Sequence, residues 1–195
     1  PASGLGGGSG NAAAALLAAN RVWNLNWSQK QLADLAAELG SDVPFFLASR
    51  EKPGALMAIC TGRGERVGAK PAPAGMHFVV ARPRGGLSTA EVYKRCEASS
   101  RPRSADALQS ALIAGRNQAA VVEMKNQLQP AAAQLSPAVV ELGRQFAELR
   151  PLAHQLSGSG SAYFGWFASG KAAQRAASQL RNWGHPFVWQ VRSIG

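Results

Sequence analysis

The chain begins with a glycine-rich segment followed directly by alanines, PASGLGGGSGNAAAA at Pro1–Ala15. Glycine has no Cβ, so backbone N–H groups in such a segment can turn toward a ligand and approach it closely. A helix that begins directly after the glycines adds its unpaired N–H groups and the positive end of its dipole. The pattern therefore predicts a cradle for an anion, best suited to the phosphates of a nucleotide.

The residues present exclude two common phosphate loops. A Walker loop requires a lysine directly after its last glycine, and no lysine occurs in Gly4–Asn11. The dinucleotide-binding fingerprint requires G-x-G-x-x-G after a strand, and GLGGGS at Gly4–Ser9 breaks that spacing. On composition alone, a flexible N-terminal tail remains the alternative to a phosphate cradle.

Asp42 is the acidic residue with the clearest chemical potential. Phosphoryl transfer to a hydroxyl needs a carboxylate that orients the hydroxyl and accepts its proton. On its own, an aspartate in GSDVPFF, Gly40–Phe46, more often caps the turn before Pro44. The residues alone leave both roles open.

A second glycine-rich segment, SGSGS at Ser157–Ser161, lies between two apolar stretches and by itself predicts a hairpin turn. The helical spacing around Tyr93 by itself predicts a core tyrosine. His154 and His185 have no partner in the sequence, so we expect structural roles for both. We also expect three tryptophans to lie in the core, namely Trp23, Trp166 and Trp189.

Helices and strands are predicted to alternate without a strict βαβ period, which indicates an α+β fold in two layers. The predicted helices run from Ser9–Asn11 to Trp23, over 28–39, 88–96, 105–114 and 117–128, from Ser136 and Pro137 onward, and over 171–182. The predicted strands cover 55–59, 77–81, 152–156, 162–167 and 187–191.

Two proline-containing segments are predicted to break the regular elements. We expect Pro44 to prevent a helix and to leave Phe45–Leu47 as a short buried segment. The segment GAKPAPAG at Gly68–Gly75 is rich in proline and glycine, so we expect a loose joint between two domains there.

The net charge of +10 favours a polyanionic partner, either nucleic acid or a small substrate that carries phosphates. The basic residues are scattered, and aromatic residues do not interleave with them as in single-strand binders. This pattern favours a solvated basic surface over a nucleic-acid track.

The composition also limits the compartment and the kind of site. A hydrophobic content of 46% with 16% charged residues is typical of a globular chain. No apolar run approaches the ~20 residues that span a bilayer, and no signal-peptide pattern is visible. Two cysteines, Cys60 and Cys96, are too few for a disulfide framework and form no metal-ligand cluster. We therefore expect a cytoplasmic protein without a membrane partner and without a protein-bound metal site.

Five segments, taken in order, carry a resemblance to the GHMP small-molecule kinases. They are PASGLGGGSGNAAAA (1–15), GSDVPFF (40–46), GRGERV (62–67), RPRGGLSTAEVYK (82–94) and LSGSGSAYFGWF (156–167). The first resembles the second motif of this family, and the last resembles its third motif, a second glycine loop beside the nucleotide. Each segment alone is weakly specific, but together they extend the resemblance over nearly the whole chain. The glycine run with Asn11 and the GSDVPFF segment are most similar to members that act on a cytidine diphosphate-linked sugar alcohol.

This resemblance implies an α+β fold of the GHMP-kinase type with two lobes. Residues 1–75 would form part of an N-terminal lobe, which in the family is similar to the second domain of a small-subunit ribosomal protein. Residues 76–195 would form the C-terminal lobe, a ferredoxin-like α/β sandwich.

The resemblance also implies ATP and Mg²⁺ as ligands and assigns roles to single residues. Asp42 matches the catalytic aspartate. Tyr93 matches an aromatic residue that stacks on the cytosine ring, and Thr89 lies near it on the substrate-binding segment. A serine hydroxyl of the glycine loop can meet Mg²⁺. The residues implied to bind ATP are Gly4, Gly6, Gly7, Gly8, Ser9, Gly10, Asn11, Gly158, Ser159 and Gly160.

The implied reaction transfers the γ-phosphate of ATP to the 2-hydroxyl of a cytidine diphosphate-linked methylerythritol, a precursor of isoprenoids. Another GHMP kinase, such as a homoserine or mevalonate kinase, is an alternative that GGGSGN and GSDVPFF disfavour. A non-catalytic nucleotide-binding domain and a basic nucleic-acid binder are alternatives from other classes.

The chain departs from the family pattern at two places. In MKNQLQPAA, which begins at Met124, Gln127 and Gln129 replace residues that are usually acidic in the family, so the role of Asn126–Gln129 stays open. The stretch that precedes the glycine loop in the family, including a lysine near the reacting hydroxyl, has no counterpart here. We therefore expect the chain to be a fragment that is inactive alone, with an oligomeric state that the sequence does not reveal.

Overall fold

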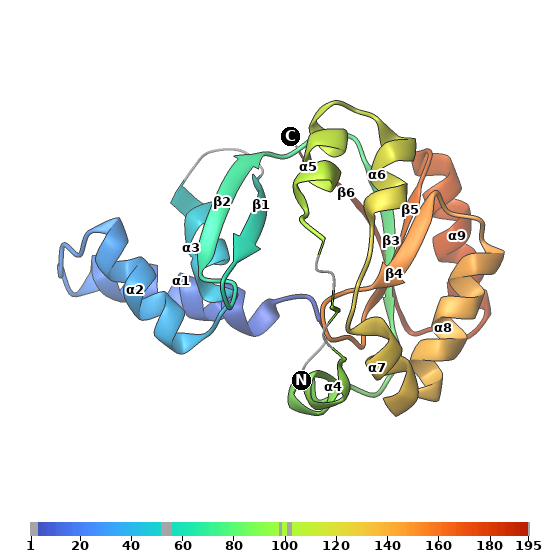
Figure 1. Cartoon of the computed structure of the whole chain (residues 1–195), viewed down its shortest axis with the longest axis horizontal. Helices are drawn as coiled ribbons and strands as arrows, with labels where there is room; N and C mark the ends of the chain where they lie inside the picture. The colour runs from blue at the N-terminus through green and yellow to red at the C-terminus, as the bar shows by residue number, and fades with distance from the viewer. Residues whose placement is uncertain (1–3, 52–55, 98, 101–102, 195) are drawn as a thin grey trace. The chain divides into compact units, whose positions relative to one another are not determined.

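The computed structural model of the 195-residue chain describes residues 4–51, 56–97, 99–100 and 103–194 (Figure 1). Pro1–Ser3 of the first glycine-rich motif and Ala55 of the first predicted strand lie outside the described residues. The chain divides into two compact units. The larger unit takes the described residues of 1–5 and 73–193, and the smaller unit takes those of 6–72 and Ile194.

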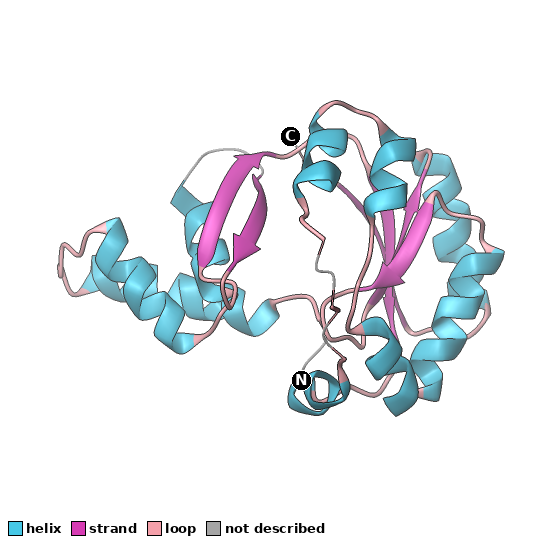
Figure 2. Cartoon of the chain, in the orientation of Figure 1, coloured by secondary structure: helices cyan, strands magenta, loops and turns pink. Residues whose placement is uncertain are grey.

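The smaller unit combines three helices with a two-stranded antiparallel ribbon among its described residues, the strands drawn in magenta in Figure 2. Its elements are α1 (Gly7–Val22), α2 (Gln29–Leu39), α3 (Val43–Glu51), β1 (Leu56–Thr61) and β2 (Arg66–Pro71). The ribbon pairs Leu56 with Pro71 and Thr61 with Arg66. The helices bury Ala13, Leu32 and Leu47 against one another.

Local capping explains where α2 begins. The side chain of Ser28 accepts a hydrogen bond from the N–H of Gln31, and the Gln31 side chain accepts one from the N–H of Ser28. This reciprocal arrangement is the predicted capping box, and it satisfies two N–H groups that the helix itself leaves unpaired.

One prediction for the smaller unit is wrong, and another is correct only in part. Val43–Glu51 is a helix, and Pro44 does not prevent it because the missing N–H and the fixed φ of proline are tolerated in a first turn. The two units divide between Ala72 and Pro73, inside the segment predicted as a joint, but strand β2 extends through Pro71, so the first half of that segment is paired with β1. Proline is tolerated there because it is the last residue of the strand in a two-stranded ribbon.

The larger unit is built on a four-stranded antiparallel sheet with the order β4-β5-β3-β6. Its strands are β3 (His77–Arg82), β4 (Ala153–Leu156), β5 (Tyr163–Phe167) and β6 (Phe187–Arg192). Its helices are α4 (Thr89–Arg95), α5 (Asp106–Ile113), α6 (Asn117–Glu123), α7 (Gln129–Leu135), α8 (Pro137–Glu148) and α9 (Gly170–Asn182). The β3–helix–β4–β5–α9–β6 order and the central position of β3 give the ferredoxin-like topology that the family resemblance implied.

Alternation along the strands divides the side chains between the two faces of this sheet. Val79 and Phe167 point to one face and form the main core with residues of α4, α7, α8 and α9. Phe78 and Trp166 point to the other face, which α5 and α6 cover with Ala111 and Ala120 (Figure 1).

Some details of the larger unit differ from the sequence predictions. The helix predicted over 117–128 ends at Glu123, and a separate helix, α7, begins at Gln129 with Pro130 in its first turn. Trp166 is buried as predicted, but Trp189 is exposed on β6, and Trp23, in the smaller unit, is exposed at the end of α1. Apolar type alone does not decide burial, since much of a folded surface is apolar.

Within the part of the chain that the structure describes, no helix combines the length and apolarity needed to cross a bilayer.

Candidate active site

The glycine run of the smaller unit forms the first turn of α1, which begins earlier than predicted, at Gly7. Gly6 caps the helix in the left-handed conformation, with φ 65°, and its carbonyl accepts the first helical hydrogen bond, from Gly10 N at 2.8 Å. The N–H groups of Gly7, Gly8 and Ser9 therefore precede the first bond of the helix and are available to an anion. No acidic side chain stands in this turn to compete.

The surroundings of these glycines differ in a way that separates structural from ligand-facing positions. A Cβ on Gly6 would lie 2.5 Å from the ring of Phe46, which fixes glycine there by packing. Among the described residues, a Cβ on Gly7 or Gly8 would meet no atom within 4 Å apart from its chain neighbours and the nearby backbone of its own helix. The protein therefore leaves open space beside Gly7 and Gly8, at the positively polarised end of a 16-residue helix.

Asp42 lies in the same unit, directly before α3, and its side chain is exposed. Its carboxylate has no hydrogen bond or ion pair with any residue that the structure describes, so it does not cap the turn through its side chain. Burial raises the pKa of the nearby Cys60 thiol, and the negative charge of Asp42 raises that pKa further. The arrangement leaves a free carboxylate that can accept a proton.

The SGSGS segment connects β4 and β5 in the larger unit, and each of its serines bonds to a different segment. Ser157 Oγ donates to the carbonyl of Gly4 at 2.7 Å, and Ser161 Oγ donates to the carbonyl of Gly85 at 2.9 Å. Ser159 Oγ lies 2.9 Å from Thr89 Oγ1. The loop is therefore tied to the start of the chain, to the segment before α4, and to α4 itself.

The glycines between these serines adopt conformations that other residues rarely reach. Gly158 has φ 55° and Gly160 has φ 88°. Gly4 also has a positive φ of 73°, and a Cβ there would lie 2.2 Å from the Ser157 carbonyl oxygen. Gly4 thus approaches the second glycine loop too closely to carry a side chain.

The two residues predicted to bind the sugar-linked substrate stand on α4. Thr89 is exposed at its first turn, and Tyr93 exposes 61% of its surface while the adjacent Val92 is buried. The core position that helical spacing alone predicted for Tyr93 is therefore wrong, because Val92 takes the inward face of this helix.

Asn126 and Gln129, whose segment departs from the family pattern, bond to the end of β4, and Asn126 also bonds to the second glycine loop. Asn126 donates to the carbonyls of Leu156 and Gly158, and Gln129 accepts from the N–H of Leu156. Sequence reasoning missed these contacts because they join positions about thirty residues apart. The resemblance itself gave the only signal, since the segment occurs in order between the other motifs.

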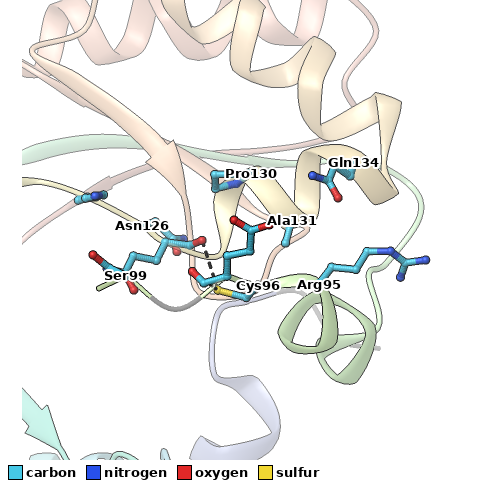
Figure 3. A pocket seen from close by; sticks show the side chains of 10 residues that line it. Arg95, Cys96, Ser99, Asn126, Pro130, Ala131 and Gln134 are labelled. Atoms are coloured by element: carbon cyan, nitrogen blue, oxygen red, sulfur yellow. Dashed lines mark hydrogen bonds between the residues drawn. The ribbon is translucent and has the colours of Figure 1, made fainter. Parts of the chain in front are cut away.

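A cavity of about 300 Å³ lies beside this segment, lined by the end of α4, residues 125–127 and α7 (Figure 3). Cys96 Sγ donates to the carbonyl of Gln127 at 3.5 Å within it, and the Arg95 guanidinium points away from Cys96. Thr89 and Tyr93 are not among its lining residues. The cavity is therefore separate from the predicted substrate-binding positions.

The structure thus places the predicted site residues in two groups, one in each unit. The larger unit brings together Gly4, Thr89 and the loop 158–160 through direct contacts with the SGSGS serines. The smaller unit holds Gly6–Asn11 in the first turns of α1 and Asp42 at the start of α3. Among the described residues, no group of three or more His, Cys, Asp and Glu side chains gathers to hold a metal ion.

The sequence matches two family descriptions, "GHMP kinases N terminal domain" over residues 1–50 and "GHMP kinases C terminal" over residues 104–186. A crystal structure of 4-(cytidine 5'-diphospho)-2C-methyl-D-erythritol kinase is similar with a TM-score of 0.78 and 32% identity, and the match covers 100% of this chain and 67% of that one. The chain belongs to the GHMP kinase family. Its α+β fold is therefore the GHMP-kinase fold that the five motifs indicated.

Curated relatives of this GHMP kinase chain carry a consistent name. Proteins named 4-diphosphocytidyl-2-C-methyl-D-erythritol kinase from Pelotomaculum thermopropionicum and a Nocardioides species are 37% and 40% identical to it, over 92% and 96% of its length. The chain spans only 61% and 63% of those two relatives. A homoserine kinase from Cytophaga hutchinsonii, with a TM-score of 0.68 but 17% identity, shares the fold alone.

Proposed function

We propose that the protein is an ATP-dependent kinase that phosphorylates the 2-hydroxyl of 4-diphosphocytidyl-2-C-methyl-D-erythritol, in non-mevalonate isoprenoid precursor biosynthesis. The observation that carries this proposal is the match, at 37–40% identity over nearly all of this chain, to relatives of that name. Because the chain spans about three fifths of those relatives, the proposal concerns the protein expressed from its complete gene. We also propose that residues 1–75 and 76–195 correspond to the two lobes of the family.

The phosphates of ATP would bind at the first turn of α1. Three N–H groups there precede the first helical bond, and the space beside Gly7 and Gly8 is open, which suits a phosphate chain. Asn11 belongs to the same stretch. The resemblance assigns the loop Gly158–Gly160 to the same nucleotide. Both of its glycines have positive φ, and Gly158 is exposed while Gly160 is buried.

Mg²⁺ bound with ATP takes most of its ligands from phosphates and water, so a dedicated cluster of acidic residues is not required. The Ser9 hydroxyl stands in the first turn of α1 and is a suitable protein ligand. The ion would neutralise charge that develops on the transferred phosphoryl group.

Asp42 would act as the proton acceptor. The substrate hydroxyl oxygen forms a new bond to the γ-phosphorus, the bond from that phosphorus to the ADP oxygen breaks, and the hydroxyl proton passes to the carboxylate. An exposed carboxylate without a protein partner is free to take this role, whereas one committed to a cap or an ion pair would first have to break that contact.

Replacing Gly8 tests the phosphate cradle. In Gly8→Val, the new Cβ meets no atom of another described segment within 4 Å, and the side chain enters the space proposed for phosphate. The KM for ATP should therefore rise by at least tenfold while the fold is retained. Ala18→Val, on the exposed side of the same helix, is the matched control for the cost of a β-branched residue in a helix. ADP release by the protein from the complete gene measures both. A well-folded Gly8→Val protein with unchanged ATP dependence would rule out the cradle.

A further inference from the structure

The loop that joins β4 and β5 is held from one side by the amide of Asn126. This amide donates one hydrogen bond to the Leu156 carbonyl at 2.9 Å and another to the Gly158 carbonyl at 2.8 Å. Its oxygen accepts from the N–H of Leu128 at 2.9 Å. The side chain therefore fixes both the end of β4 and the first glycine of the loop, and its own orientation is fixed by the backbone that follows it.

Gln129, the first residue of α7, also bonds to the end of β4. Its oxygen accepts from the N–H of Leu156 at 2.9 Å, and its nitrogen donates to the hydroxyl of Tyr163 at 3.3 Å. Both backbone polar groups of Leu156 are thus bonded to side chains of segment 126–129. Tyr163 is buried on β5, the strand on the far side of the loop, so Gln129 connects the two strands that flank it.

We propose that Asn126 and Gln129 are positioning residues that hold the second glycine loop in its nucleotide-binding shape. This inference rests on the proposed assignment of Gly158–Gly160 to ATP. A loop with two glycines has many accessible conformations, so ordering it in the protein alone lowers the conformational entropy that ATP binding would otherwise lose.

The chemistry of the two amides makes the proposal specific. Asn126 uses its N–H groups toward two carbonyls, and only a donor can serve there. Aspartate at this position has the same shape, but its carboxylate would face two carbonyl oxygens. Gln129 accepts from a backbone N–H and meets a hydroxyl that can itself donate, so glutamate can replace it.

Hydrogen exchange in the absence of nucleotide measures how strongly Asn126 and Gln129 order the loop. In the protein expressed from its complete gene, Asn126→Asp should speed the exchange of backbone amides at 156–160 by at least tenfold, and Gln129→Leu should do so as well. Gln129→Glu should restore much of the protection that Gln129→Leu loses. Gln127→Ala, an exposed neighbour in the same segment, should leave exchange as it is in the parent. Unchanged exchange in Asn126→Asp would overturn the proposal.

Steady-state kinetics separate positioning from a general loss of stability. Asn126→Asp should raise the KM for ATP by about tenfold, the scale of one or two lost hydrogen bonds, with little change in the KM for the cytidine substrate. Equal losses for both substrates, or faster exchange with an unchanged ATP dependence, would overturn the proposal. If Asn126→Asp does not fold, Asn126→Ala replaces it in both measurements. A parent protein that neither binds nor consumes ATP would instead overturn the proposed function. Hydrogen exchange would then still report whether Asn126 and Gln129 order residues 156–160.

Discussion

Tyr93 is an exposed residue that the family resemblance assigns to substrate binding. Its ring projects from α4 while Val92 anchors the helix in the core, so the ring contributes little to packing. Because the residue as a whole is 61% exposed, its ring can offer a stacking surface to a flat ring such as cytosine. Thr89, one turn earlier, already shares a hydrogen bond with Ser159, which links the helix that bears Tyr93 to the second glycine loop.

Removing this ring should weaken binding of the cytidine substrate alone. Tyr93→Ala should cost about 1–3 kcal/mol, the range for stacking of a base on an aromatic side chain, and the KM for ATP should hardly move. Tyr93→Phe keeps the stacking face and is the matched control. Titration of the substrate into each variant measures the effect. Equal weakening of ATP and substrate would show instead that the residue supports the fold.

The hairpin of β4 and β5 shows how one element supports the loop at its tip. His154 Nδ1 lies 3.1 Å from the Tyr163 hydroxyl, and the Tyr163 ring stacks on Phe146 of α8 at 5.3 Å between centroids. Burial lowers the pKa of His154 and raises the pKa of Tyr163. Both groups are therefore held in their neutral forms at neutral pH beneath the glycine loop.

The lowered pKa of His154 predicts a loss of stability in acid. The pKa of histidine in the unfolded chain is about 6.5. Just below that pH, the unfolded chain therefore binds more protons than the folded one. The free energy of unfolding should therefore fall as pH decreases from about 6.5 toward the folded pKa. His185, whose pKa burial also lowers, adds a contribution of the same sign. Urea unfolding between pH 7 and 5 should show a smaller decrease in His154→Gln than in the parent; an equal decrease would contradict the assignment.

At the scale of the whole chain, the sequence predicted most elements because their signals are local. Ser28 and Gln31, and Ser136 before Pro137, lie within one helical turn of the groups that they cap. The succession of elements indicated an α+β fold in two layers, and the family resemblance supplied the ferredoxin-like order of the larger unit. Pro44 misled because its effect depends on whether it stands inside a helix or in the first turn of one.

Tertiary contacts decided what the local patterns could not. Asn126 bonds to Leu156, which is 30 residues away in the sequence, and no local pattern predicts such a hydrogen bond. Trp189 looked like a core residue from its type, but β6 is the edge strand and its outer positions are exposed. The positions of Gly4, Asp42 and the SGSGS loop were predicted from motif resemblance, and their binding and catalytic roles stay predictions.

We propose that this family member transfers phosphate to a cytidine-linked alcohol with Asp42 as the proton acceptor. The most direct measurement is ADP release by the protein from its complete gene, with ATP, Mg²⁺ and 4-diphosphocytidyl-2-C-methyl-D-erythritol, in the parent and in Asp42→Asn. Asp34→Asn is the control, since Asp34 makes only an exposed ion pair with Lys30 on α2. Turnover should fall by about 10²–10⁴-fold in Asp42→Asn, the scale of general-base catalysis, and remain near the parent value in the control. Near-parent turnover in Asp42→Asn would contradict the role of Asp42, and a parent that releases no ADP with this substrate would contradict the proposed reaction.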